Sequence, residues 1–396
     1  MKLNETNKSS STNSSEITAK NISRLIKGGK IPTPKEIMAY LDERVIGQED
    51  AKKRLSVAVY NHYKRVFSNI CGLGNDSEFA DIEIDKSNIT ILGPTGTGKT
   101  FLIQNIAKML GVPCHIHDCT KLTEAGYVGE DVENILTGLL MACDYDVERA
   151  QIGIVCLDEF DKIAKKGENM SIVRDVSGEG VQQNLLKIVE GSVVGVMPQG
   201  GRKHPEQPLV PIDTTNILFI GMGAFVGLED IIKKRTSKSQ AIGFNLLGDN
   251  NVAKVDEENI LDYTTAIDLK KFGLIPELIG RFPVITHTKD LKKEDLVRII
   301  TEPKNSIMRQ YQKLAYIDGK KLTFTDDAVD YIAEAAIATE TGARGIRSIL
   351  ETVLNNFMFE ISDYEGTEVV IDKEYCEKSL KNFVLFAPKP EYKKAV

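Results

Sequence analysis

The sequence lacks the features that mark membrane proteins, secreted proteins and general nucleic-acid binders. No apolar run approaches the roughly 20 residues that a membrane-spanning helix needs, and the longest, at 217–228, is interrupted by glycines. The N-terminus has no apolar core after a basic start, so we expect no secretory signal and a cytoplasmic location. The net charge of −7 argues against a nucleic-acid partner, because such binders are normally basic.

Cysteine and histidine are scarce, and their spacing predicts no metal site or protease centre. The six cysteines include no C-x-x-C pair, and the five histidines include no H-E-x-x-H motif or evident Ser-His-Asp set. One cluster, Cys114-His115-Ile116-His117-Asp118-Cys119, does contain soft metal ligands. Strand alternation would put its members on two opposite faces, so a second sheet strand is favoured over a metal site.

The pattern of predicted strands and helices changes along the 396 residues, which predicts two folded domains between polar ends. Residues 1–32 are polar and low in complexity, which indicates a disordered tail. Strand and helix patterns alternate over 33–285, as in an α/β domain whose parallel sheet carries helices on both faces. Helical patterns dominate over 286–386, which indicates a smaller domain, and a flexible tail is expected at 387–396.

Hydrophobic periodicity predicts the individual elements. A capping box with proline at the first helical position, Thr33-Pro34-Lys35-Glu36, is expected to open the first helix. Strands are predicted at 88–92, 113–118, 152–157, 216–221 and 368–371. Further helices are predicted at 48–66, 99–110, 131–143, 179–190, 291–315, 325–339 and 343–360.

The glycine-rich stretch at 93–100 is the strongest functional signal, because it matches G-x-x-x-x-G-K-[ST] between a predicted strand and a predicted helix. Glycines let backbone N–H groups turn inward, and the helix N-terminus adds partial positive charge, so such a loop holds a polyphosphate. The alternative is a glycine turn that binds nothing, but both flanks favour ATP. The candidate ATP-binding residues are Gly93, Pro94, Thr95, Gly96, Thr97, Gly98, Lys99, Thr100 and Phe101.

The roles within this loop follow from its chemistry. Lys99 is expected to reach the β and γ phosphates, and Thr100 to ligate Mg²⁺.

A second signal follows the apolar run 154–157, where Asp158 and Glu159 resemble a Walker B pair. There the aspartate would hold Mg²⁺ through water, and the glutamate would polarise the attacking water. Such pairs also occur as helix caps, but their place some 60 residues after the P-loop favours catalysis.

Together these motifs resemble the AAA+ ATPases, and most closely their branch that unfolds proteins for the ClpP peptidase. The resemblance runs from about residue 34 to 386. It implies a homohexamer that uses ATP and Mg²⁺ to unfold degron-tagged proteins, with possible adaptors, and that is not itself a protease. In this family Val45 and Ile46 match a segment that packs on adenine. Arg281 matches a finger that completes the neighbouring subunit's site, and Arg344 matches a sensor of nucleotide, although alone each reads as a surface or ion-paired arginine.

The resemblance also assigns substrate and partner contacts. Tyr127 and Val128 match a pore loop, Arg174 a second pore loop, and Arg202, Lys203 and His204 a basic loop at the pore entrance. Ile242, Gly243 and Phe244 match a tripeptide that docks on ClpP. The family usually begins with a domain of zinc-binding cysteines, but the first 35 residues here contain no cysteine, so no zinc site is expected. The sensor 1 region, 220–224, shows no polar side chain, and no residue is assigned there.

Other functions remain open. A stand-alone remodeller would need no ClpP, and the intact tripeptide at 242–244 disfavours it. A nucleic-acid motor on the same core is disfavoured by the acidic balance and the aromatic at Tyr127. A non-enzymatic nucleotide-binding scaffold would need the loss of Lys99, Glu159 or Arg281, and all three are present.

Overall fold

A computed structural model describes residues 26, 29–72, 78–123, 130–165, 178–197, 209–242, 257–339 and 341–381. The chain forms two compact units. The first contains Glu49–Pro94 and Lys99–Thr288. The second contains the chain from Lys289 together with the short segments Asp42–Gln48 and Thr95–Gly98.

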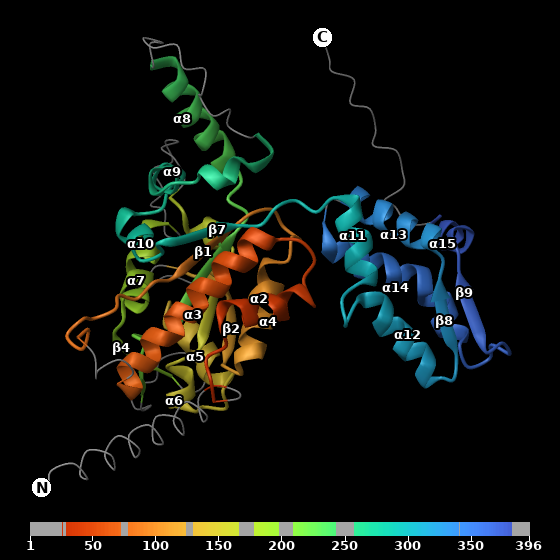
Figure 1. The fold of residues 1–396 in the computed structure, drawn as a ribbon, viewed down its shortest axis with the longest axis horizontal. Helices are drawn as coiled ribbons and strands as arrows, with labels where there is room; N and C mark the ends of the chain where they lie inside the picture. The colour runs from red at the N-terminus through yellow and green to blue at the C-terminus, as the bar shows by residue number, and fades with distance from the viewer. Residues whose placement is uncertain are drawn as a thin grey trace, which may run out of the picture. The chain divides into compact units, whose positions relative to one another are not determined.

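A five-stranded parallel sheet organises the first unit (Figure 1). Its strand order is β2-β3-β6-β1-β7. The strands are β1 (Ile89–Leu92), β2 (Cys114–Asp118), β3 (Ile154–Asp158), β6 (Leu218–Gly223) and β7 (Val284–His287). Every residue of β1 and β6 is buried, so these central strands are covered on both faces. The four strands predicted for this domain are confirmed, and β7 is an addition, because its Val-Ile-Thr-His sequence is too short and polar to read as an apolar run.

Helices pack against the strands of this sheet. For example, α3 packs on β7, α4 on β3, and α5 on β2 and β3. The bounds of these helices are α3 (Glu49–Cys71), α4 (Lys99–Leu110) and α5 (Asn134–Met141), and α7 spans Glu179–Glu190. The remaining helices of this unit are α2 (Pro34–Asp42), α6 (Val147–Ala150), α8 (Leu228–Ile242), α9 (Ala266–Phe272), α10 (Pro276–Gly280) and the 3₁₀ turns η1 (Cys119–Lys121), η2 (Phe160–Ile163) and η3 (Glu257–Tyr263).

One local prediction is tested where α2 begins, and an element that was not predicted lies between α7 and β6. The capping box is confirmed, because Thr33 Oγ1 accepts from the Glu36 N–H and the Glu36 carboxylate accepts from the Thr33 N–H. An antiparallel hairpin of β4 (Val193–Val196) and β5 (Val210–Asp213) was not predicted. Glycine in one strand and proline in the other weaken its sequence signal.

The second unit is mostly helical and packs around its own apolar core. It contains α11 (Lys293–Thr301), α12 (Ile307–Ile317), α13 (Asp326–Ala338), α14 (Ala343–Glu360) and α15 (Lys373–Leu380), with β8 (Lys321–Phe324) parallel to β9 (Glu368–Ile371). The prediction of one helix over 291–315 was wrong, because Pro303 cannot continue the backbone ladder and the chain breaks into α11 and α12. The strand predicted at 368–371 is confirmed. Among the described helices, none is long and apolar enough to cross a bilayer.

Candidate functional site

The loop between β1 and α4 adopts a backbone that only glycine accepts easily. Gly93, Gly96 and Gly98 have φ angles of +131°, +82° and +91°, in the region that side chains disfavour. At Gly93 there is also no room, since an added Cβ would collide with Thr288 Oγ1 and lie 2.5 Å from the Thr288 carbonyl oxygen. The three glycines therefore set the path of the loop, and the sequence motif has a physical cause.

Lys99 opens α4 and folds back over its own loop. Its ammonium donates to the Gly93 carbonyl at 2.6 Å and to the Pro94 carbonyl at 2.7 Å, and the residue is 9% exposed. Thr100 follows in the first turn and is half-buried, whereas Phe101 is exposed. A cation and a hydroxyl thus lie together at the N-terminus of a helix, which is where anions bind well.

Asp158 and Glu159 lie at the end of β3, as the sequence predicted. Asp158 is the last residue of the strand, and its Oδ1 accepts from the Glu159 N–H at 3.0 Å. Glu159 has φ 54° and ψ 36°, a left-handed conformation that is rare for a residue with a side chain. Residues held in such a conformation cluster at active sites. Its side chain is exposed.

Sheet topology brings these two motifs to one edge. β1 and β3 both pair in parallel with β6, in the registers Leu92↔Gly223 and Leu157↔Gly221. The P-loop and Asp158 therefore both follow the carboxyl ends of strands separated by a single neighbour, where open α/β sheets bind ligands. The hydroxyl of Thr100 and the carboxylate of Asp158 are hard oxygen donors, so this edge fits a magnesium nucleotide.

Arg281 lies at the opposite end of the strands, beside the amino ends of β1 and β7. We call this side of the sheet the amino edge, and the side with the P-loop the carboxyl edge. It precedes β7, whose Val284 pairs with Ile89 at the amino end of β1, and its carbonyl accepts from the Asn88 amide at 2.8 Å. From Asn88 to Gly93 the strand covers roughly 16 Å at about 3.3 Å per residue. Arg281 is therefore remote from the P-loop of its own chain.

The sequence did not reveal the side-chain contacts that Arg281 and Gln182 make with distant parts of the chain. Its guanidinium contacts Glu190 of α7, with an Nη2–Oε1 distance of 2.8 Å. The fully buried Gln182, also on α7, donates to the carbonyls of Ile163 and Gly273 and accepts from the N–H of Ile275. These partners lie about 20 or 90 residues apart, and no local pattern links them.

The predicted adenine segment and Arg344 lie in the second unit. Val45 and Ile46 are buried there, and Gln48 forms two hydrogen bonds of 2.8 Å with the backbone of Lys289. Arg344 is exposed in the first turn of α14, after Gly342, whose φ is +60°.

Most of the predicted substrate and docking residues lie outside the described part of the chain. These are Tyr127, Val128, Arg174, Arg202, Lys203, His204, Gly243 and Phe244. Ile242 ends α8, and its side chain is likewise not described.

The histidine and cysteine cluster forms a strand, as predicted. β2 spans Cys114–Asp118, and burial lowers the pKa of His115 to about 4. Its ring fills the space beside Gly138, where a Cβ would collide with it. No group of three or more metal-ligating side chains occurs among the described residues.

Known families match this architecture in both units. Residues 84–285 match the AAA domain (Cdc48 subfamily), and residues 291–363 match the C-terminal, D2-small domain of ClpB protein. The fold and the site thus define an AAA+ nucleotide-binding ATPase.

Sequence identity to individual proteins identifies the family within this class. The ATP-dependent Clp protease ATP-binding subunit ClpX of Porphyromonas gingivalis is 53% identical over 355 residues, covering 90% of this chain and 84% of the relative. ClpX of Bacteroides thetaiotaomicron is 52% identical over 352 residues, with 89% and 83% covered. ClpX of Borrelia duttonii is 53% identical over 345 residues, with 87% and 78% covered. The chain belongs to the ClpX family, whose members are ATPases and not themselves proteases.

Proposed function

We propose that this protein is an ATP-dependent unfoldase that threads polypeptides through the pore of a homohexamer and delivers them to the ClpP peptidase. The observation that carries the proposal is the division of catalytic groups between two edges of one sheet. Lys99 and Glu159 lie at the carboxyl edge, whereas Arg281 lies at the amino edge. Similarity to ClpX proteins, which are named as ATP-binding subunits of the Clp protease, supports the coupling to ClpP.

The carboxyl edge would bind Mg-ATP. The loop N–H groups and Lys99 would hold the phosphates, while Thr100 and Asp158 would hold Mg²⁺, partly through water. When bound, the ion neutralises charge on the β and γ phosphates. Glu159 would polarise the attacking water, and its left-handed backbone is consistent with a residue held for catalysis.

Arg281 would act in a neighbouring subunit. A transferring phosphoryl group needs positive charge around its oxygens, and an arginine supplied by another chain provides it in many NTPases. An arginine remote from its own P-loop requires a partner copy, and a closed ring gives every copy the same partner. Val45 and Ile46 would contact adenine, and Arg344 would report the nucleotide state.

The remaining roles follow from the family resemblance. Tyr127 would grip the substrate, with Val128 and Arg174 beside it in the pore. Arg202, Lys203 and His204 would attract the free α-carboxylate of a substrate end. The tripeptide at 242–244 would dock on ClpP. Because folded domains are stable by only about 5–15 kcal/mol, repeated pulls can unravel them.

Loss of fluorescence from a fluorescent protein with an unstructured C-terminal tag would test this proposal. The protein is incubated with ATP, with and without a ClpP whose active site is inactivated so that it traps substrate. Glu159→Gln is the matched control, since it keeps the shape of the side chain and removes its charge. ATP-dependent loss of fluorescence that increases with trapping ClpP is the expected result.

Other outcomes are equally informative. Unfolding without any effect of ClpP would indicate a stand-alone remodeller. ATP hydrolysis with no unfolding of any tagged protein would contradict the unfoldase assignment.

A further inference from the structure

The left-handed turn at Glu159 is held by the residues that follow it. Glu159 has φ 54° and ψ 36°, which is unfavourable for a residue with a Cβ, so surrounding contacts must impose it. The Lys162 N–H donates to the Glu159 carbonyl oxygen at 2.9 Å and closes the turn locally. The side chains of Phe160 and Asp161 then fix the turn against the sheet.

Two glycines of β6 receive these side chains. Gly221 and Gly223 alternate along the strand and so lie on one face of it. A Cβ added at Gly221 would lie 2.7 Å from the Phe160 ring, and a Cβ added at Gly223 would collide with Asp161 Oδ1. The two residues after Glu159 therefore fill the two places on β6 where the strand has no side chain. We call Phe160, Asp161, Gly221 and Gly223 the lock.

Both side chains of the lock are tightly enclosed. Phe160 is 1% exposed, and its ring packs against that of Phe282 with the centroids 5.1 Å apart. The Asp161 side chain is 4% exposed, and its Oδ2 lies 3.3 Å from the half-exposed Lys162 ammonium. Closely packed side chains leave the backbone beside them little freedom, and that backbone begins at Glu159.

The lock also relates Glu159 to the P-loop, because β6 pairs with β1 on its other side. Gly223 is the register partner of Leu92, the residue directly before Gly93. A side chain seated against Gly223 thus lies beside the strand that leads into the P-loop. This arrangement gives a physical reason for the glycines of the sensor 1 region at 220–224.

We propose that Asp161, seated against Gly223, is a positioning residue for ATP hydrolysis, and that the lock keeps Glu159 where its carboxylate meets the attacking water. This inference rests on the proposed function, because it assumes that Glu159 polarises that water. A misplacement of about 1 Å can cost about 100-fold in rate. A residue that acts only through Glu159 should therefore change kcat and leave nucleotide binding unchanged.

Four variants of the full-length protein test the lock. Asp161→Ala empties the place at Gly223, whereas Asp161→Asn keeps the shape of the side chain and removes its charge. Gly223→Ala leaves the carboxylate intact but displaces it. Gly138→Ala is the matched control, since its Cβ would collide in the same way with the ring of His115 on β2, away from Glu159.

The measurements are kcat and KM for ATP, the affinity for ADP from displacement of a fluorescent analogue, and thermal unfolding to confirm folding. Asp161→Ala and Gly223→Ala should each lower kcat about 10- to 100-fold, with KM and ADP affinity within about threefold of the parent. Asp161→Asn and Gly138→Ala should keep a kcat close to the parental value. In a Glu159→Gln chain, Asp161→Ala should cause no further loss.

Two results would overturn the lock while leaving the proposed function intact, provided that Glu159→Gln still abolishes hydrolysis. One is a parental kcat in folded Asp161→Ala and Gly223→Ala. The other is a kcat for Asp161→Asn as low as that of Asp161→Ala, because the charge and not the fit of the side chain would then matter. Parental hydrolysis by Glu159→Gln would overturn both the proposed role of Glu159 and the lock.

Discussion

Arg281 and Glu190 form an ion pair on the surface of the first unit, with Nη2 and Oε1 2.8 Å apart. The pair is roughly half exposed, so it contributes at most about 1 kcal/mol to stability. Because the ion pair is weak, breaking it would cost little free energy if Arg281 acts on a neighbouring nucleotide as proposed.

Arg281→Lys should lower the ATPase rate by about 10³-fold or more, as expected for loss of an arginine finger. ATP affinity should change little, because the residue is remote from its own P-loop. Steady-state hydrolysis and equilibrium binding of a fluorescent ATP analogue measure the two effects. Glu190→Gln is the control, since it weakens the ion pair and keeps the guanidinium. Parental hydrolysis by Arg281→Lys would contradict the assignment.

Two glycines of the loop should differ sharply in their tolerance of alanine. Gly98→Ala meets no atom within 4 Å but keeps a φ of +91°, so a loss of about 1–2 kcal/mol is expected. Gly93→Ala adds a collision with Thr288 to the same backbone strain, so about 3 kcal/mol or more is expected. Denaturant unfolding midpoints measure the difference. Equal midpoints for the two variants would show that Thr288 moves away from the added methyl group at no cost in free energy.

The buried His62 should make stability depend on pH. Burial, with a smaller effect of Arg65 and Lys86, lowers the pKa of His62 from 6.5 to about 3. Between these values the unfolded chain binds a proton that the folded chain does not, so the free energy of unfolding falls as the pH falls. The slope from this group approaches about 1.4 kcal/mol per pH unit.

His62→Gln isolates that contribution. The glutamine amide can still donate to the Asn216 carbonyl, as His62 Nε2 does at 3.2 Å, but it does not titrate. Urea unfolding at several pH values between 4 and 6 should show a shallower slope for the variant. Superimposable slopes would mean that His62 is protonated in the folded protein.

Gln182→Leu should destabilise the first unit and slow hydrolysis. The Gln182 side chain is fully buried. Leucine would remove its amide and so leave two backbone carbonyls and the Ile275 N–H without their hydrogen-bond partner. A loss of about 2–4 kcal/mol is expected. Gln182→Glu is a useful comparison, since it keeps an acceptor for Ile275. Thermal unfolding and ATPase rate are the measurements, and an unchanged midpoint would contradict the role.

Sequence patterns predicted the strands and the loop that build the carboxyl edge, because those signals are local. Four apolar runs, the P-loop at 93–100 and the Asp158-Glu159 pair each fall within one window of the chain. The sheet order, and with it the approach of Asp158 to the P-loop across β6, depends on pairing between distant strands. The position of Arg281 at the amino edge depends on β7, a strand that the sequence did not reveal.

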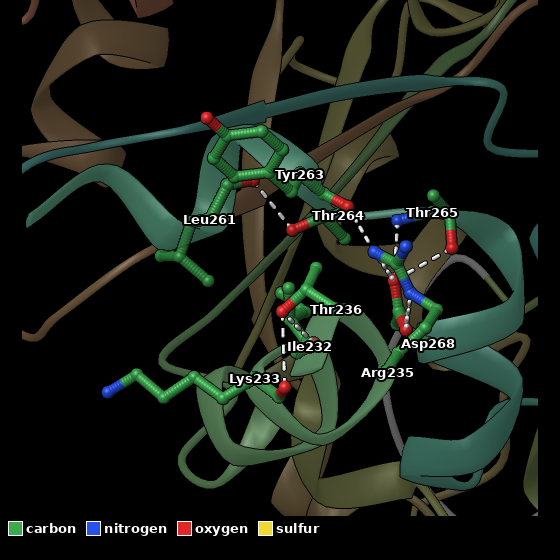
Figure 2. A network of polar contacts seen from close by, with 9 residues as sticks. All are labelled: Ile232, Lys233, Arg235, Thr236, Leu261, Tyr263, Thr264, Thr265 and Asp268. Atoms are coloured by element: carbon green, nitrogen blue, oxygen red, sulfur yellow. Dashed lines mark hydrogen bonds and ion pairs between the residues drawn. The ribbon is translucent and has the colours of Figure 1, made fainter. Parts of the chain in front are cut away.

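Long-range polar contacts were the least predictable part. Gln182 of α7 donates to the carbonyls of Ile163 and Gly273, and Arg235 of α8 pairs with Asp268 of α9, 33 residues further along the chain (Figure 2). Neither residue type nor spacing distinguishes them from solvated side chains. The break at Pro303 was readable in principle, but the apolar period on either side of it favoured a single helix over 291–315.

The separation of Arg281 from the P-loop has a consequence for mixtures of chains. A chain with Arg281→Lys retains an intact Lys99 and Glu159, whereas a chain with Glu159→Gln retains an intact arginine. If Arg281 acts in the neighbouring subunit as proposed, neither chain should hydrolyse ATP at an appreciable rate alone, but where the first stands beside the second in one assembly, a complete set of groups would meet at their junction. Two inactive alleles should therefore restore part of each other's activity, and in a cell either allele should poison the assemblies of the intact protein that it joins.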